Sequence, residues 1–208
     1  MPFQQDTSMN RDDVMLDDTE ILHDGFFRME HFLFRHRLYE GDWSPQLSRE
    51  ILVHSPVAPV IPYDPVRDEI VLIEQFRGGI YASGDENPWS VEIVAGIIEP
   101  GETAAEMAVR EAKEEAGCVM TDVEKILDFY PSPSGSSEYV ALYWGRVSTI
   151  GVGGFHGVAE EGEDIRVFTE TTDEALRKIT TGEINSSIGI IGVQWLALNR
   201  EKLRRQFT

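Results

Sequence analysis

The sequence predicts an α+β fold in which a mixed β-sheet lies between helical layers, preceded by a small antiparallel β unit. Three observations lead to this prediction. Apolar runs of strand length alternate with turn signals through the first half of the chain. One clearly marked helix then interrupts the strands, and two further helices close the chain. This order of elements is typical of a layered α+β sandwich.

The N-terminal part divides into a tail and a β unit. Residues 1–18 are polar and acidic, and we expect a disordered tail there. Residues 19–55 are expected to form the β unit, with strands over residues 26–39 and 48–54 around a Gly41–Asp42 turn. A unit this small has difficulty burying both faces alone, so it should pack on the main domain or on a second subunit.

Residues 56–208 are expected to form the main domain. Strands are predicted over residues 57–63, 69–76, 89–95, 123–130, 139–147 and 165–169, with helices over 172–181 and 186–204. The glycine-rich segment 151–157 is expected to be a flexible loop. It lacks the lysine and the following helix of a phosphate-binding P-loop.

The best-marked helix should begin at Ala104. Thr103 has N-cap chemistry, Glu106 completes a capping box, and Gly117 suits the helix end. Three carboxylates then project from one side of this helix, namely Glu111, Glu114 and Glu115. Such a cluster repels itself and needs an arginine or a metal ion. It is either a solvated acidic face or half of a metal and diphosphate site.

The spacing of these residues resembles the signature of the Nudix hydrolases. That signature is a glycine, a glutamate six positions on, and then Arg-Glu-apolar-x-Glu-Glu-x-Gly-apolar. Its fixed positions are all present, as Gly96, Glu102, Arg110, Glu111, Glu114, Glu115 and Gly117. Ala112 and Cys118 fill the apolar positions with smaller residues than usual. The resemblance implies the Nudix α/β/α sandwich and a hydrolase of nucleoside diphosphates linked to another group.

Two further segments resemble the ADP-ribose pyrophosphatase subfamily. Residues 132–138 resemble its proline loop, with Pro133 at the expected place, and residues 157–167 resemble its mobile catalytic loop. The resemblance runs from about residue 25 to 207 and implies cleavage of ADP-ribose to AMP and ribose 5-phosphate. The alternatives are another substrate, such as GDP-mannose or a different ADP-sugar, and a non-catalytic sensor of ADP-ribose.

The resemblance also implies a metal site and a catalytic group. Its metal ligands correspond to the carbonyl of Ala95 and the side chains of Glu111, Glu115 and Glu163, holding two or three Mg²⁺ ions, with Mn²⁺ as the alternative. Glu161 corresponds to the general base, and Glu114 and Arg110 complete the catalytic group. Arg110, with Glu102, should orient the cluster. Without the resemblance, Glu161 and Glu163 are equally well solvated loop charges.

Substrate contacts are implied for residues in both parts of the chain. They are Phe27 for adenine, Arg49 and Arg77 for the substrate, Pro133 in the proline loop, and Glu138 near the terminal ribose. His23 and Asp24 stand where a basic residue is expected, which departs from the family on the adenine side. The two arginines could instead cover a sheet face, and Pro133 could only shape a turn.

Composition limits the partners. A formal net charge of −19 argues against a nucleic-acid backbone or an anionic membrane as partner. The single cysteine and the lack of a visible targeting segment favour the reducing cytoplasm. The aromatic N-terminal unit and family precedent indicate a homodimer in which N-terminal strands contribute to the partner's site.

Overall fold

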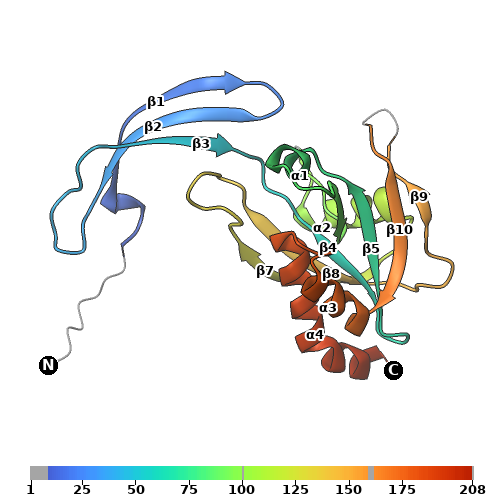
Figure 1. Cartoon of the computed structure of the whole chain (residues 1–208). Coiled ribbons are helices and arrows are strands. Elements are labelled where there is room, and N and C mark those ends of the chain that lie inside the picture. The colour runs from blue at the N-terminus through green and yellow to red at the C-terminus, as the bar shows by residue number, and fades with distance from the viewer. Residues whose placement is uncertain (1–8, 100, 159–161, 208) are drawn as a thin grey trace, which may run out of the picture. The chain divides into compact units, whose positions relative to one another are not determined.

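The computed structural model describes residues 9–99, 101–158 and 162–207 (Figure 1). The chain forms two compact units. The first contains residues 1–55 together with 132–138, and the second contains residues 56–131 and 139–208. The proline loop predicted at 132–138 therefore belongs with the N-terminal unit, because it is held by strand β3 (Leu47–Val53). Leu52 donates to the Gly135 carbonyl at 2.9 Å and accepts from the Ser137 N–H at 3.0 Å.

The first unit is a three-stranded antiparallel sheet in the order β1-β2-β3. Strand β1 (Val14–Asp24) pairs with β2 (Arg28–His36) over its whole length, and β2 pairs with β3. The expected disordered tail is thus wrong from Arg11 onward, where a short 3-10 helix (Arg11–Asp13) precedes β1. Pairing with β2 stabilises a strand that the polar sequence does not mark, while residues 1–8 lie outside the described part of the chain.

The second unit is built on a seven-stranded mixed sheet with the strand order β7-β8-β4-β5-β10-β9, in which β6 also pairs with β5. Neighbours β4 and β8 are parallel and the other named pairs are antiparallel. The strands are β4 (Val60–Asp64), β5 (Glu69–Phe76), β6 (Trp89–Glu92), β7 (Thr121–Phe129), β8 (Val140–Arg146), β9 (Gly154–His156) and β10 (Ile165–Thr171).

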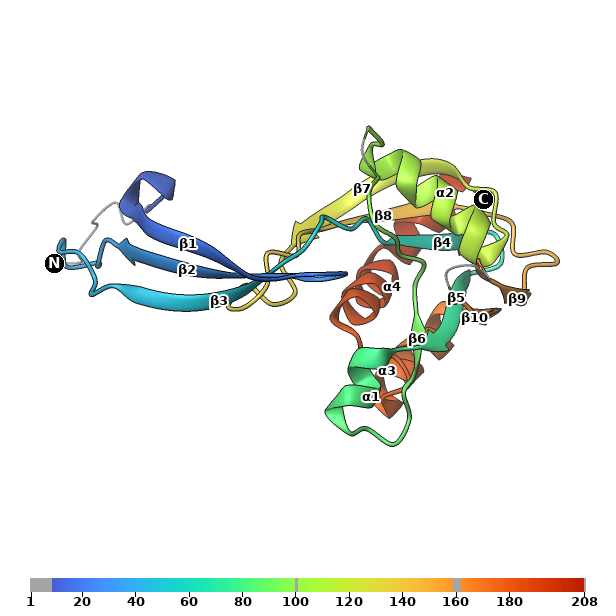
Figure 2. The same ribbon diagram turned by 90° about the horizontal axis from the view of Figure 1, so that it is seen from above.

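Helices cover both faces of this sheet, as Figure 2 shows. Helix α2 (Ala104–Ala116) lies on one face, and helices α3 (Thr172–Thr181) and α4 (Ser187–Phe207) lie on the other. The short α1 (Gly78–Ser83) connects β5 to β6. The expected mixed sheet between helical layers is confirmed. The predicted acidic cluster belongs to α2 and therefore lies on that face of the sheet.

The two larger of three hydrophobic clusters within the described residues hold the layers together. Ile61, Leu72 and Trp144 pack under α4 with Leu196, whereas Val71 and Ile73 pack under α2. Three buried alanines of α2 belong to the second core, namely Ala108, Ala112 and Ala116. Small side chains let a helix approach the sheet closely. The acidic side of α2 therefore lies close to residues 95–96, which follow strand β6.

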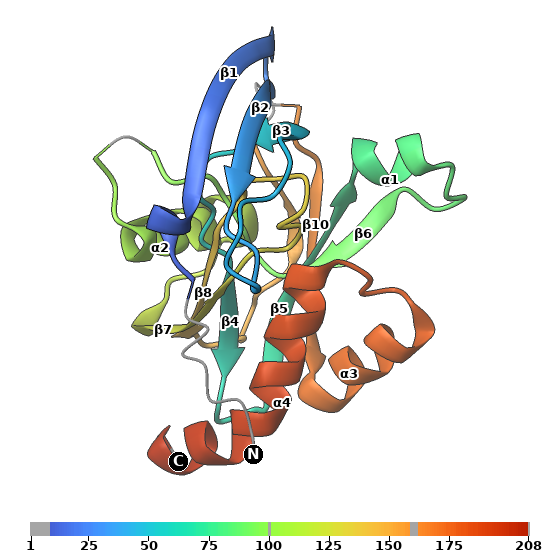
Figure 3. The ribbon, with the colours of Figure 1, turned by 90° about the vertical axis from the view of Figure 1, so that its left-hand side faces the viewer.

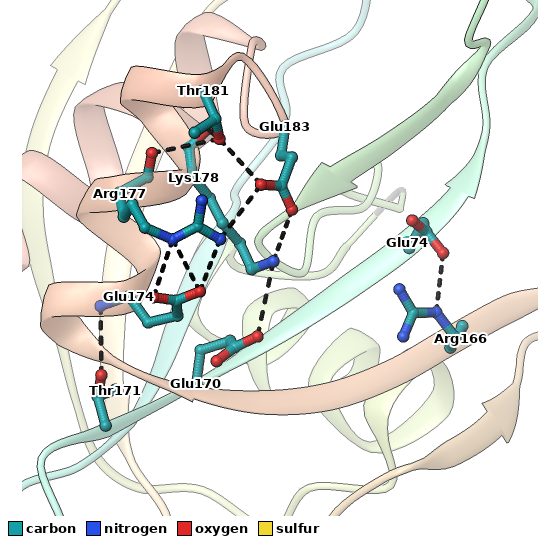
Figure 4. A network of polar contacts seen from close by, with 9 residues as sticks. All are labelled: Glu74, Arg166, Glu170, Thr171, Glu174, Arg177, Lys178, Thr181 and Glu183. Atoms are coloured by element: carbon teal, nitrogen blue, oxygen red, sulfur yellow. Dashed lines mark hydrogen bonds and ion pairs between the residues drawn. The ribbon is translucent and has the colours of Figure 1, made fainter.

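Helices α3 and α4 lie side by side in Figure 3, and an ion-pair network fixes α3 to strand β10 (Figure 4). Lys178 Nζ is 2.7 Å from Glu183 and 3.6 Å from Glu170. Arg177 pairs with Glu174 at 2.7 Å. These cations are matched by carboxylates of the same unit, so this face has a structural role.

None of the helices within the described residues is both long enough and apolar enough to cross a lipid bilayer.

Candidate active site on helix α2

Helix α2 is positioned by strong local signals at both ends. Thr103 accepts a hydrogen bond from the Glu106 N–H, and Glu106 accepts from the Thr103 N–H at 2.9 Å. This is the predicted capping box. Gly117 ends the helix with φ 63°, a left-handed conformation that favours glycine. The helix thus begins and ends where the sequence predicts, and its register places the carboxylates.

Arg110 organises one part of the acidic cluster. Its guanidinium donates to Glu102 at 2.9 Å, to Glu111 at 2.8 Å and to Glu114 at 3.0 Å. The hydrogen bond that Arg110 donates to Glu102 is the main reason why the pKa of Arg110 is raised, and the same bond lowers the pKa of Glu102. The expected orienting role of Arg110 and Glu102 agrees with these contacts.

Glu111 and Glu115 turn toward the chain that follows strand β6. Glu115 is 4% exposed and accepts a hydrogen bond from the Ala95 N–H at 3.3 Å. The Glu111 carboxylate lies against Gly96 so closely that a methyl group there would overlap it. The glycine of the motif therefore makes room for a carboxylate.

The electrostatics of this pair are unfavourable without a cation. Burial, followed by the charge of Glu111, raises the pKa of Glu115 to about 8. Burial also raises the pKa of Glu111, although Arg110 opposes the shift. Both groups gain from a positive charge beside them. No basic side chain is hydrogen-bonded to Glu115 within the described residues.

Arg77 and Glu163 complete the described site. Arg77 donates to Glu92 at 2.6 Å, and burial opposes its charge while Glu92, Glu115 and Glu163 raise its pKa. Glu163 also acts on the pKa values of Glu111 and Glu115, so it belongs to the same cluster. Its carboxylate accepts from the Val158 N–H at 3.1 Å.

Comparisons with known proteins agree with this arrangement. A NUDIX domain model matches residues 53–199. ADP-ribose pyrophosphatase of Escherichia coli (strain K12) is 39% identical over 206 residues, covering 99% of this chain and 98% of that protein. The same enzyme of Haemophilus influenzae (strain ATCC 51907 / DSM 11121 / KW20 / Rd) is 34% identical, covering 95% and 92%. The chain belongs to the Nudix family. It is a Nudix hydrolase that groups with the ADP-ribose pyrophosphatases.

A GDP-mannose pyrophosphatase of Enterobacter sp. (strain 638) is a more distant Nudix relative, at 28% identity over 181 residues, 86% of this chain and 93% of that protein. Among solved structures, a crystal structure of an ADP compounds hydrolase superposes with a TM-score of 0.71 and 18% identity. It covers 96% of this chain and 99% of that one, and it supports the Nudix fold.

The donor set fits the divalent metal ions on which Nudix hydrolases generally depend. Glu111 and Glu115 are hard oxygen donors on one side of a helix, and a bound cation would favour the ionised form that burial disfavours. Over the described residues, no three acidic, histidine or cysteine groups converge tightly enough to hold an ion in this conformation. Glu111 is hydrogen-bonded to Arg110 and Glu163 to Val158 instead.

The remaining predicted site residues fall into two groups. Glu161 lies outside the described residues. Phe27, Arg49, Pro133 and Glu138 all belong to the first unit, so the structure does not place them with the cluster on α2, and their roles stay predictions. Within that unit, the Phe27 ring is half-exposed and lies 5.8 Å from the His54 ring.

Sequence reasoning missed three polar residues on the strands beneath the cluster. Glu92 binds Arg77, and Gln75 and Ser90 are buried beside this ion pair. A polar residue within an apolar strand is the signal that could have revealed them. Glu92 does interrupt the apolar run that contains Val91 and Ile93.

Proposed function

We propose that this Nudix hydrolase cleaves the diphosphate bond of ADP-ribose to AMP and ribose 5-phosphate. The observation that carries the proposal is the pair formed by the partly buried Glu111 and the buried Glu115, with Arg77 close enough to interact electrostatically with Glu115. Two ionisable carboxylates and one guanidinium are suited to a metal-bound diphosphate. The substrate itself is proposed from near full-length similarity to proteins named ADP-ribose pyrophosphatases.

The proposed metal ligands are the carbonyl of Ala95 and the carboxylates of Glu111, Glu115 and Glu163. We propose Mg²⁺, with Mn²⁺ as the alternative, and two or three ions per site. When bound, divalent ions neutralise a diphosphate and make hydroxide available near neutral pH. Glu163 would have to leave the Val158 N–H to act as a ligand.

The other side chains bind the substrate, orient the glutamates or take up a proton. Arg77 binds a phosphate oxygen of the substrate, and Arg110 holds Glu111 and Glu114 in place through the contacts described above.

Glu161 is the proposed general base that takes a proton from the attacking water. We expect Glu161→Gln to lower kcat by roughly 10²- to 10⁴-fold, with Glu160→Gln as the neighbouring control. Equal rates for the two variants would exclude Glu161 as the base.

We propose that Phe27, Arg49, Pro133 and Glu138 contact the nucleoside and ribose ends of the substrate.

We further propose a homodimer. Strand β1 is exposed along its length, and its large apolar side chains include Val14, Leu16 and Ile21. Such a surface favours a second protein surface over water. Light scattering on the purified protein tests this, and a mass of one chain would contradict it.

The proposed setting is the cytoplasm, with neither nucleic acid nor membrane as partner. The buried single thiol of Cys118 and the net charge of −19 support this.

One assay tests the function. Purified protein is incubated with Mg²⁺ and a panel that includes ADP-ribose, other ADP-sugars and GDP-mannose, and the release of AMP or GMP is measured. We expect ADP-ribose to give the highest kcat/KM. A higher kcat/KM for GDP-mannose would identify the second candidate, which the more distant relative favours. Tight ADP-ribose binding without AMP release would instead identify a sensor.

A further inference from the structure

On the face of the sheet that α2 covers, two buried side-chain atoms have no hydrogen-bond partner among the described residues. Among the described residues, Gln75 Nε2 and Ser90 Oγ are each enclosed and unpaired. Gln75 is 8% exposed and Ser90 is 1% exposed. Buried donors in folded proteins are nearly always paired, since an unpaired one destabilises the fold. Gln75 and Ser90 thus offer two neighbouring donors to an acceptor that comes within reach.

The two side chains lie on the face of the sheet that carries the active site. Gln75 on β5 is the direct cross-strand partner of Ser90 on β6, and two residues along, Ile73 is the partner of Glu92. Directly opposed residues share one face of a sheet. Ile73 packs in the core under α2. Gln75, Ser90 and Glu92 thus all face α2.

The Arg77 and Glu92 ion pair crosses this row. Arg77 follows Gln75 by two residues, and Glu92 follows Ser90 by two residues on the antiparallel strand, so the Gln75 and Ser90 pair lies between them. The bond at 2.6 Å therefore reaches over the two unpaired donors. The Arg77 side chain is 42% exposed, whereas that of Glu92 is 12% exposed. Arg77 can move into the site, but Glu92 cannot reach water easily.

We propose that Gln75 and Ser90 are positioning residues that bind the Glu92 carboxylate when Arg77 turns to the diphosphate of the substrate. A largely buried carboxylate such as that of Glu92 would be strongly destabilised if it lost Arg77, its cation within the described residues, unless other donors replaced it. The Gln75 amide and the Ser90 hydroxyl are such donors, and they lie on the same face one residue pair away. The inference rests on the proposed hydrolysis, because Arg77 needs an anionic phosphate to bind.

The same exchange explains why the donors are unpaired in the free protein. A guanidinium and a carboxylate form stronger hydrogen bonds than an amide or a hydroxyl forms with a carboxylate. Arg77 therefore keeps Glu92 until a second anion competes for it. The charges of Glu115 and Glu163 lie close enough to Arg77 to favour its position in the site.

Steady-state kinetics with ADP-ribose and Mg²⁺ test the proposal. The variants are Gln75→Met and Ser90→Ala, with Gln194→Met, an exposed position on α4, as the matched control. We expect Gln75→Met to raise KM by roughly 10- to 100-fold, the range for a hydrogen bond to a charged group. Ser90→Ala should raise it less. Neither should lower the Tm of the free protein, because each removes an unpaired buried donor.

Repeating the measurement in the Glu92→Gln variant distinguishes a positioning role of Gln75 from a packing role. Without the Glu92 charge, Arg77 is already free to turn, and the replacement donors are no longer needed. Gln75→Met should then change KM less than twofold. A packing role would give the same loss in both backgrounds, and that result would overturn the proposal. So would KM values for both Gln75→Met and Ser90→Ala within twofold of the unsubstituted protein.

Calorimetry with magnesium pyrophosphate as the probe makes the test independent of the nucleoside. If the unsubstituted protein releases no AMP from ADP-ribose, the proposed function fails. The exchange is still supported if Gln75→Met weakens pyrophosphate binding tenfold or more and does so only when Glu92 is present. Equal pyrophosphate affinities for the unsubstituted protein and Gln75→Met would overturn it.

Discussion

The Ala95 N–H donates a hydrogen bond of 3.3 Å to the carboxylate of Glu115. This bond joins the chain after strand β6 to the last turn of helix α2, which are 20 residues apart in sequence. It also directs the carboxylate toward the Ala95 backbone instead of into water. Burial without a cation is unfavourable for a carboxylate, so this contact makes Glu115 the most informative residue to substitute.

The first prediction is that Glu115→Gln lowers kcat on ADP-ribose by roughly 10²- to 10³-fold while the protein stays folded. The amide keeps the shape of the side chain but removes the charge that a cation needs. Release of AMP measures the loss, and circular dichroism checks the fold. Glu201→Gln on the exposed side of α4 is the control. Near-full activity of Glu115→Gln would exclude Glu115 as a metal ligand.

The second prediction concerns pH and metal. In the metal-free protein the pKa of Glu115 is about 8, against 4.5 for an ordinary glutamate. Between pH 4.5 and pH 8, the folded state therefore holds a proton that the unfolded state has released. This contribution to stability is complete below about pH 4.5 and is lost as pH rises through about 8. We therefore expect the Tm of the metal-free protein to fall over this range.

Mg²⁺ should raise the Tm more at pH 8 than at pH 6, because it binds the ionised form. Glu115→Gln should reduce both the fall of the Tm with pH and the difference between the Mg²⁺ effects at pH 8 and pH 6. Thermal unfolding in buffers with a chelator or with Mg²⁺ measures them. A Tm that is unaffected by Mg²⁺ at pH 8 would contradict the proposed site.

The third prediction is that Gly96→Ala lowers kcat/KM by about 10²-fold, because the new methyl group displaces the Glu111 carboxylate. It should also destabilise the fold by about 1–3 kcal/mol. Gly79→Ala is the matched control, since nothing lies within 4 Å of a methyl group added there. Equal activities of the two variants would show that Glu111 need not occupy its present position.

The fourth prediction is that Arg110→Lys lowers kcat/KM by roughly tenfold. Lysine has no planar fork of donors and cannot hold Glu102, Glu111 and Glu114 together as the guanidinium does. Arg177→Lys, which changes an arginine of the structural network on α3, should leave kcat/KM unchanged. If the two variants behaved alike, the orienting role of Arg110 would be refuted.

Local chemistry accounts for the parts of the fold that were predicted well. The capping box and Gly117 determine where α2 begins and ends, because those signals act within four residues. The shorter elements were missed. Strand β9 lies where a flexible loop was expected and helix α1 was not predicted, since elements of a few residues depend on neighbours for stability. Strand β1 was missed for the same reason, as pairing with β2 stabilises it.

By itself, the sequence determined the helix that carries the carboxylates, their common side and the family. The spacing along one helix is a property of the local chain. Only the tertiary structure decided that Glu115 is buried against Ala95, that Gly96 makes room for Glu111 and that Gln75 and Ser90 lie beneath Arg77 and Glu92. Those relationships join segments distant in sequence, and sheet pairing and burial, which no local pattern encodes, bring them together.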